Sequence, residues 1–137
     1  MRGLIQRVDY AKVVVDGEVS GEIGPGILLF LGIHKNDHEG LITPLLKKCL
    51  GLRIFENDEG KMDLSLEDTG GGLLVVSQFT LYGNCQKGRR PSYDQAARPD
   101  DARKLYNAFV ARAKDMVPDV QAGVFGAHMD VTLHNDG

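Results

Sequence analysis

Apolar and polar residues alternate over short stretches in the first part of the chain, and turn signals separate these stretches. Residues 1–9 follow the period of two that is typical of a half-buried strand, and residues 12–15 form a second, β-branched run. An Asp-Gly pair then predicts a tight hairpin into residues 18–23. Residues 27–33 are almost all apolar, which favours a central strand covered on both faces. We expect these four strands to form a meander.

Two later segments have the spacing of amphipathic helices. The first is expected to open near Asp37, with Asn36 or Asp37 as its N-cap, and its apolar stripe runs to Leu50. The second begins at Pro99, where proline and the two acids that follow suit a helix start, and it ends before Pro118. Shorter strands are expected over residues 52–55, 61–64, 120–125 and 129–133.

One apolar strand ends in polar residues that are able to carry chemistry. Residues 73–82 are expected to form a buried strand, with glycines on both sides. Alternation turns Ser77 and Phe79 to one face of this strand, and Gln78 and Thr80 to the other. Polar side chains at the end of an apolar strand need hydrogen-bond partners or a function.

The order of these elements predicts the fold class. Runs of strands interrupted by two helices indicate an α+β fold, in which a curved antiparallel or mixed β-sheet, or an open barrel, carries two amphipathic helices. Seventeen glycines in 137 residues agree with many tight turns and a β-rich chain. No repeat, low-complexity segment or linker interrupts the sequence, so residues 1–137 are expected to form a single domain.

Composition narrows the class of protein. Hydrophobic residues make up 42% and charged residues 26%, as in an ordinary soluble globular protein. The net charge of −3 gives no global signal for nucleic-acid binding, so any RNA contact needs a local basic patch. No apolar run approaches 18 residues and no leader is visible, so neither a membrane span nor a secretory signal is expected. Cys49 and Cys85 are expected to be free thiols in a reducing cytoplasm.

A cluster of cations follows the polar end of the 73–82 strand. Lys87, Arg89 and Arg90 lie within four residues, around a glycine. Cations on an exposed loop suit phosphate oxygens, and the glycine lets the backbone approach them. The alternative is a solvated basic turn, but the position shortly after Thr80 favours contact with a substrate backbone.

Other kinds of site find no support. The four histidines lack the spacing of metal ligands, and neither a nucleotide-binding glycine loop nor a Gly-x-Ser-x-Gly elbow occurs, so we expect no metal and no cofactor. Thr80 is the one hydroxyl in a special setting, but no histidine or carboxylate lies close in sequence to act as its base. Thr80 could attack a substrate, orient it, or cap the strand. Backbone N–H groups freed where the strand bends could instead stabilise an oxyanion, and we prefer this interpretation because the segment contains no acid or base.

Nine short motifs, in this order, make the chain resemble the D-aminoacyl-tRNA deacylases from end to end. The most specific of them is Ser-Gln-Phe-Thr-Leu at residues 77–81. The others lie at residues 1–8, 16–19, 24–26, 52–55, 60–62, 87–92, 123–127 and 135–137.

The resemblance implies an activity and a set of site residues. It implies a homodimer with a cross-subunit active site that hydrolyses the ester between a D-amino acid and the 3′ adenosine of a tRNA, and that also removes glycine mischarged onto alanine tRNA. The first signature motif of the family implies the catalytic residues Ser77, Gln78, Phe79 and Thr80. The implied residues for binding the substrate and tRNA are Lys87, Arg89, Arg90, Phe125 and Met129.

The second signature motif of the family is Gly-Pro-Val-Thr, whose cis Gly–Pro peptide enters the partner subunit's site and excludes L-amino acids. Its glycine maps onto Gly137, with Arg7 as the supporting residue. The sequence stops there, and we expect further residues to follow in the native protein, because a cis X–Pro bond is kept only for a reason. A smaller departure is His128, where the family usually has an acidic residue.

The resemblance leaves two mechanisms open. Thr80 could be the nucleophile, or the 2′-hydroxyl of the terminal ribose could assist hydrolysis. The lack of a base near Thr80 favours the second mechanism, with the backbone of Gln78 and Phe79 binding the oxyanion and Thr80 positioning the substrate. Two other hypotheses also stay open: a non-catalytic tRNA- or DNA-binding relative that retains the fold, and a structural dimer module, which would leave the loop cations without a role.

Overall fold

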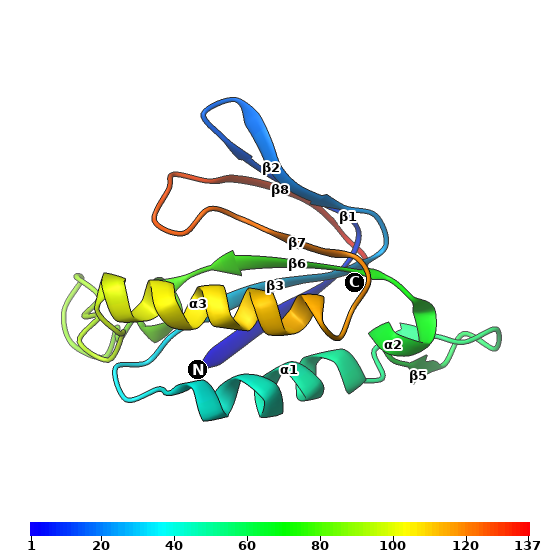
Figure 1. Ribbon diagram of the computed structural model, residues 1–137, viewed down its shortest axis with the longest axis horizontal. Coiled ribbons are helices and arrows are strands. Elements are labelled where there is room, and N and C mark those ends of the chain that lie inside the picture. Colours follow the sequence, from blue (N-terminus) through cyan, green and yellow to red (C-terminus); the bar gives the residue numbers. More distant parts are fainter.

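The computed structural model describes all 137 residues as a strongly curved mixed sheet with helices on one face (Figure 1). The sheet has six strands in the order β2-β1-β3-β6-β7, and β8 pairs with β1. The strands are β1 (Arg2–Val15), β2 (Glu18–Ile23), β3 (Gly26–Gly32), β6 (Gly72–Ser77), β7 (Val120–Ala122) and β8 (Asp130–Asn135). The main helices are α1 (Ile42–Gly51) and α3 (Pro99–Lys114). This confirms the predicted α+β class.

The smaller elements fill the connections. They are the 3-10 helices η1 (Glu39–Leu41) and η2 (Phe79–Tyr82), the two-stranded ribbon of β4 (Phe55–Glu56) and β5 (Met62–Leu64), and the single-turn helix α2 (Leu66–Thr69). The sequence analysis missed α2, although its capping box was readable, since Ser65 and Asp68 satisfy each other's backbone N–H groups. None of the helices is long and apolar enough to cross a membrane.

The first strand differs from the prediction. Residues 2–15 form one long strand rather than two short ones, so the predicted four-strand meander is wrong. Strands β3 and β2 pair with β1 in one continuous register, as shown by the pairs Arg2–Gly32, Val8–Gly26 and Ala11–Ile23. The two strands therefore lie end to end along a single edge of β1. The opposite edge of β1 pairs with β8. The long strand therefore joins both halves of the curved sheet, which local periodicity could not show.

The sheet separates two apolar layers. On β3 and β6, alternate residues such as Leu29 and Val75 face α1 and α3, and they belong to a core of 17 buried residues. Their neighbours, such as Leu28 and Leu74, face the concave side and belong to a second core of seven buried residues. Burial on both faces of β3 confirms the prediction of a central, doubly covered strand.

The bounds of other elements also differ from the predictions. The first helix does not start at Asp37, because that carboxylate accepts hydrogen bonds from the backbone of His34 instead, and α1 begins only at Ile42. The closing strands are shorter or shifted, at 120–122 and 130–135. Both cysteines are free, as predicted, with Cys49 buried and Cys85 exposed.

Candidate functional site

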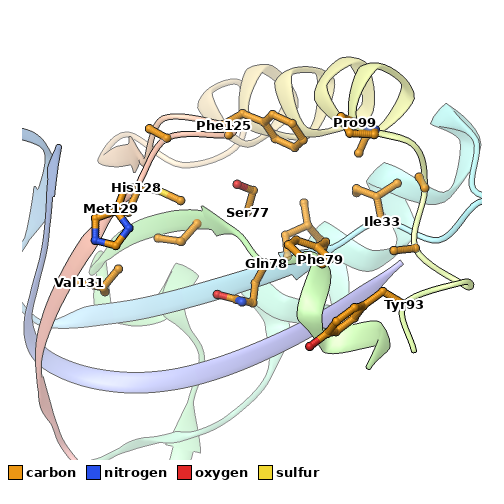
Figure 2. A pocket seen from close by; sticks show the side chains of 17 residues that line it. Ile33, Ser77, Gln78, Phe79, Tyr93, Pro99, Phe125, His128, Met129 and Val131 are labelled. Atoms are coloured by element: carbon orange, nitrogen blue, oxygen red, sulfur yellow. The ribbon is translucent and has the colours of Figure 1, made fainter. Parts of the chain in front are cut away.

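A pocket of about 600 Å³ opens where β6 ends, between the start of α3 and the segment that leads into β8. Figure 2 shows the Ser77 hydroxyl pointing into the space beside Phe125, with Met129 on one side of the pocket and Phe79 and Tyr93 on the other. Twelve of the 17 lining residues are hydrophobic. The pocket therefore suits a small, largely apolar group with a few polar contacts.

Five of the predicted site residues line this pocket although they lie up to 52 positions apart in sequence, from residue 77 to residue 129. They are Ser77, Gln78, Phe79, Phe125 and Met129. Thr80 is not part of the lining, and its hydroxyl accepts a hydrogen bond from the side-chain amide of Gln78. No carboxylate or histidine is paired with Thr80.

The backbone changes direction at the centre of the pocket. The prediction of a strand up to residue 82 is wrong: β6 stops at Ser77, and η2 begins at Phe79. The N–H of Gln78 donates to the Leu31 carbonyl at 2.9 Å, so it is not available to a ligand. The first hydrogen bond at the start of η2 runs from the Leu81 N–H to the Gln78 carbonyl at 3.3 Å. The N–H groups of Phe79 and Thr80 precede it, so the helix offers them no acceptor.

This geometry changes the expected oxyanion site. The prediction assigned the backbone of Gln78 and Phe79 to the oxyanion. Because the Gln78 N–H is already used, the adjacent pair of backbone donors at the bend belongs to Phe79 and Thr80. The reason lies outside the local sequence, because the acceptor that occupies Gln78 belongs to β3.

The wall opposite Ser77 is attached to the sheet by a buried tyrosine that the sequence analysis missed. The Tyr106 hydroxyl lies 2.9 Å from the Val75 carbonyl and 3.1 Å from the Gly123 carbonyl, so it ties α3 to β6 and to the wall segment. Burial raises the pKa of Tyr106 to about 12, which keeps its hydroxyl protonated as a donor. The Arg103 guanidinium stacks on Phe125, 5.0 Å from the ring centroid. The apolar stripe of α3 marked Tyr106 as a core residue and gave no sign of this role.

The mouth of the pocket presents aromatic rings to solvent. Phe79 is 58% exposed, although it is surrounded by an otherwise apolar lining. The edge-on ring of Tyr93 lies 5.1 Å from it, measured between centroids. Exposed aromatic rings beside a pocket offer a stacking surface for a flat group such as a nucleobase.

The three loop cations do not line the pocket. Lys87, Arg89 and Arg90 are exposed, and none of them takes part in an ion pair. Two backbone hydrogen bonds between Asn84 and Ser92, at 2.8 and 3.0 Å, close the base of their loop directly before the pocket residue Tyr93. The loop lies beside the start of α3, at the pocket end of the molecule (Figure 1).

Gly137 and Arg7 lie together, but away from the pocket. The Arg7 side chain donates to the Asp136 carbonyl at 2.9 Å and to the carbonyl of Ile54. Arg7 and Gly137 both border a second cavity of about 360 Å³. Val8, next to Arg7, pairs with Gly26 on β3, and Gly26 pairs with Gly72 on β6. Arg7 therefore lies level with the start of β6. The pocket lies at the other end of β6, five residues or roughly 17 Å away.

The pocket contains little acid–base capacity. Its titratable side chains are those of Tyr93 and His128, and the His128 side chain is 94% exposed. The Nε2 of His128 lies 3.8 Å from Asp130 and is turned to solvent. The groups that can act on a bound carbonyl are therefore backbone N–H donors and the Ser77 hydroxyl.

Comparison with known proteins shows which family the chain belongs to. The profile of the D-Tyr-tRNA(Tyr) deacylase family matches residues 4–137. A D-aminoacyl-tRNA deacylase of Thermosipho africanus is 54% identical over the whole chain and 92% of its own length. The D-aminoacyl-tRNA deacylase of Pelobacter propionicus is also 54% identical, over the whole chain and 94% of its own length.

Two solved structures share the fold. The c-Myc DNA unwinding element binding protein superposes with a TM-score of 0.94 at 36% identity, covering all of this chain and 93% of its own. A probable eukaryotic D-amino acid tRNA deacylase superposes with a TM-score of 0.83 over 98% of this chain and 94% of its own, and at 18% identity this likeness concerns the fold alone. Because the family profile spans nearly every residue, the chain belongs to the D-Tyr-tRNA(Tyr) deacylase family.

Proposed function

We propose that this chain hydrolyses the ester bond of D-aminoacyl-tRNA and releases the D-amino acid and the free tRNA. The observation that carries this proposal is the pocket at the end of β6, where the first three residues of the Ser-Gln-Phe-Thr motif meet Phe125 and Met129 around a largely apolar space. The relatives named D-aminoacyl-tRNA deacylase match the whole chain. The same resemblance extends the substrates to glycine mischarged onto alanine tRNA.

The geometry supports catalysis assisted by the RNA. The ester carbonyl lies at the bend of the backbone, and the N–H groups of Phe79 and Thr80 stabilise the negative charge that develops on its oxygen. Water attacks the ester carbonyl with the help of the 2′-hydroxyl of the terminal ribose, because the pocket provides no buried base, and the bond to the ribose 3′-oxygen breaks as that oxygen takes up a proton. Gln78 holds the Thr80 side chain beside this bend. Such a reaction requires no cofactor from the protein.

Two features of the surface fit the tRNA end. Phe79 and Tyr93 offer a stacking surface for the terminal adenine beside the pocket. Lys87, Arg89 and Arg90 have no protein partners and contact the phosphates of the acceptor end. The proposal includes a cytoplasmic location, which fits a tRNA substrate.

The first prediction tests the activity itself. The protein is expected to release D-Tyr from D-Tyr-tRNA at least about 100-fold faster than L-Tyr from L-Tyr-tRNA, since opposite stereochemistry cannot make the same contacts at the ester. The measurement is the rate of loss of labelled aminoacyl-tRNA for both enantiomers. If neither ester is hydrolysed faster than in buffer alone, the enzyme proposal is wrong.

The C-terminal motif acts across a dimer in this proposal. Gly137 and Arg7 lie in register with the start of β6, whereas the pocket of their own chain lies at its other end, so in this proposal a second copy brings them to the pocket. This placement supports the homodimer with a cross-subunit active site that the family resemblance implies.

Mixing two inactive variants is expected to restore activity if the site is shared. Ala97→Trp fills the pocket of one copy, and Arg7→Ala releases the C-terminal segment of the other. In an equal mixture about half of the dimers contain one copy of each variant, and each of these has one intact site out of two, so about a quarter of the unmodified activity returns. The assay is D-Tyr-tRNA hydrolysis after refolding the variants together. Activity that stays at the level of the separate variants would place both elements in one subunit.

A binding function without catalysis is the second candidate. The solved structure with the TM-score of 0.94 is named as a protein that binds a DNA unwinding element. Binding without hydrolysis predicts an affinity for DNA that falls with salt and that depends on the cations at residues 87–90. It also predicts that D-aminoacyl-tRNA stays intact after incubation with the protein. If the protein hydrolyses the ester of D-aminoacyl-tRNA, and added DNA does not inhibit this hydrolysis, the DNA-binding function without catalysis is excluded.

A further inference from the structure

The N-terminal ammonium of the chain pairs with a carboxylate whose side chain is buried. The Met1 ammonium lies 2.6 Å from the Asp37 carboxylate, and the side chains of the two residues are only 2% and 6% exposed. The same carboxylate oxygen accepts the His34 N–H at 2.7 Å. A buried carboxylate is costly without a charged partner, so the Asp37 side chain depends on the ammonium beside it.

The first wall of the pocket depends on the residue next to this ammonium. Arg2 stacks its guanidinium over the Tyr82 ring, 4.6 Å from the centroid, and donates to the Leu81 carbonyl at 2.8 Å. Leu81 and Tyr82 form the last turn of η2, the helix that presents Phe79 and Thr80. The Met1–Asp37 pair therefore fixes the start of β1, and through Arg2 it fixes the conformation of η2.

The second wall depends on the other partner of Asp37. His34 is held through its backbone N–H by Asp37, and its Nε2 lies 3.0 Å from the Gln95 Oε1. Backbone hydrogen bonds continue from this point: Lys35 donates to Gln95 at 3.0 Å, and Ala97 donates to Ile33 at 2.9 Å. Ile33, Ala96 and Ala97 line the pocket, and Figure 2 shows Ile33 facing it beside Phe79 and Pro99.

We propose that the ion pair between the Met1 α-ammonium and Asp37 positions the active site, and that acylation or extension at Met1 impairs the enzyme. Acylation turns the ammonium into a neutral amide and leaves the Asp37 carboxylate buried without its partner. Extension by even one residue moves the charge out of reach of Asp37. In both cases the ion pair that fixes η2 and the segment around Ala96 is lost. The kinetic part of the test rests on the proposed function, because it measures turnover. The structural part does not, because it measures hydrogen exchange.

The test compares three proteins that differ only at the N-terminus: one that begins with a free Met1, one with an acetylated Met1, and one with a single additional N-terminal residue. The value of kcat/KM for D-Tyr-tRNA is expected to fall at least tenfold in the two altered proteins, at a temperature where circular dichroism shows all three fully folded. Amide hydrogen exchange is expected to accelerate at least tenfold in residues 79–83 and 95–97. Exchange in the core strand β3 is expected to stay unchanged, which separates a local effect from general destabilisation.

A double modification shows whether the effect passes through Asp37. Acetylation of the Asp37→Asn variant is expected to cause at most about a twofold further change, because the ion pair is already lost. Glu59→Gln, which removes an exposed ion pair with Lys61, is the matched control and keeps full activity.

Equal kcat/KM and equal exchange in all three proteins would overturn the inference while leaving the proposed function intact. If even the protein with a free Met1 fails to hydrolyse D-Tyr-tRNA, the proposed function is wrong. Hydrogen exchange in residues 79–83 and 95–97 then decides the structural inference by itself, since it does not depend on turnover.

Discussion

A D-aminoacyl-tRNA that ends in 2′-deoxyadenosine is expected to be hydrolysed about 10³-fold more slowly than the same tRNA with a normal ribose, or slower still. Without the 2′-hydroxyl, the ester loses the one activating group that lies beside it, because the pocket contains no buried base. A positioned group that assists proton transfer raises the reaction rate by a factor of about 10²–10⁴. A group that is already attached to the substrate next to the ester raises the rate further, because it does not have to be brought into place. Single-turnover hydrolysis of the two tRNAs at saturating enzyme measures the effect.

The reciprocal change tests the role of Thr80. Thr80→Ala is expected to lower the single-turnover rate by less than about tenfold, because its hydroxyl is bonded to Gln78 and has no base to remove its proton. Thr132→Ala on the exposed face of β8 is the control, with no effect on the rate. The opposite pattern, in which Thr80→Ala loses several orders of magnitude and the deoxy substrate is cleaved normally, would make Thr80 the nucleophile.

Replacement of Gly26 by alanine is expected to abolish the native fold. β3 and β6 run parallel and begin at the paired residues Gly26 and Gly72. A Cβ atom on Gly26 would lie 2.0 Å from the Gly72 carbonyl oxygen and 2.7 Å from its nitrogen, and both are backbone atoms that cannot rotate away. The central strand pair would have to separate, so we expect a loss of more than about 4 kcal/mol in the free energy of unfolding.

A neighbouring glycine offers the matched control. A Cβ atom on Gly24 would meet nothing within 4 Å, so Gly24→Ala is expected to change the free energy of unfolding by less than about 0.5 kcal/mol. Urea denaturation followed by circular dichroism compares the two variants. A Gly26→Ala protein as stable as the Gly24→Ala protein would show that the sheet can absorb the added atom at the start of β6.

Local patterns were sufficient for the faces of the main elements. The alternation along residues 72–77 separates the helix-facing Val75 from the inward Val76, as the two buried cores confirm. The stripe of α3 and its start at Pro99 were also predicted correctly. These features depend on side-chain period and on terminal residues, which act over a few neighbouring positions and are therefore readable from the sequence.

The candidate site was only partly readable. The Ser-Gln-Phe-Thr motif and the resemblance that it carries selected residues 77–81 as the candidate segment, but did not indicate that the strand stops at Ser77. That end is decided by the Leu31 carbonyl, which accepts the Gln78 N–H from a strand more than 40 residues away. The backbone donors at the bend are consequently those of Phe79 and Thr80, a result that no property of residues 77–81 alone could predict.

The amino-acid sequence by itself determined the α+β class, the buried faces of β3 and β6, the two main helices and the family resemblance that makes residues 77–81 the candidate segment. Tertiary structure alone decided that Phe125 and Met129 reach the end of β6, that Arg7 and Gly137 lie at its opposite end, and that Met1 pairs with Asp37. The physical reason is the range of the interactions. Periodicity and capping act between near neighbours, whereas strand register and buried ion pairs join residues whose separation along the chain carries no signal.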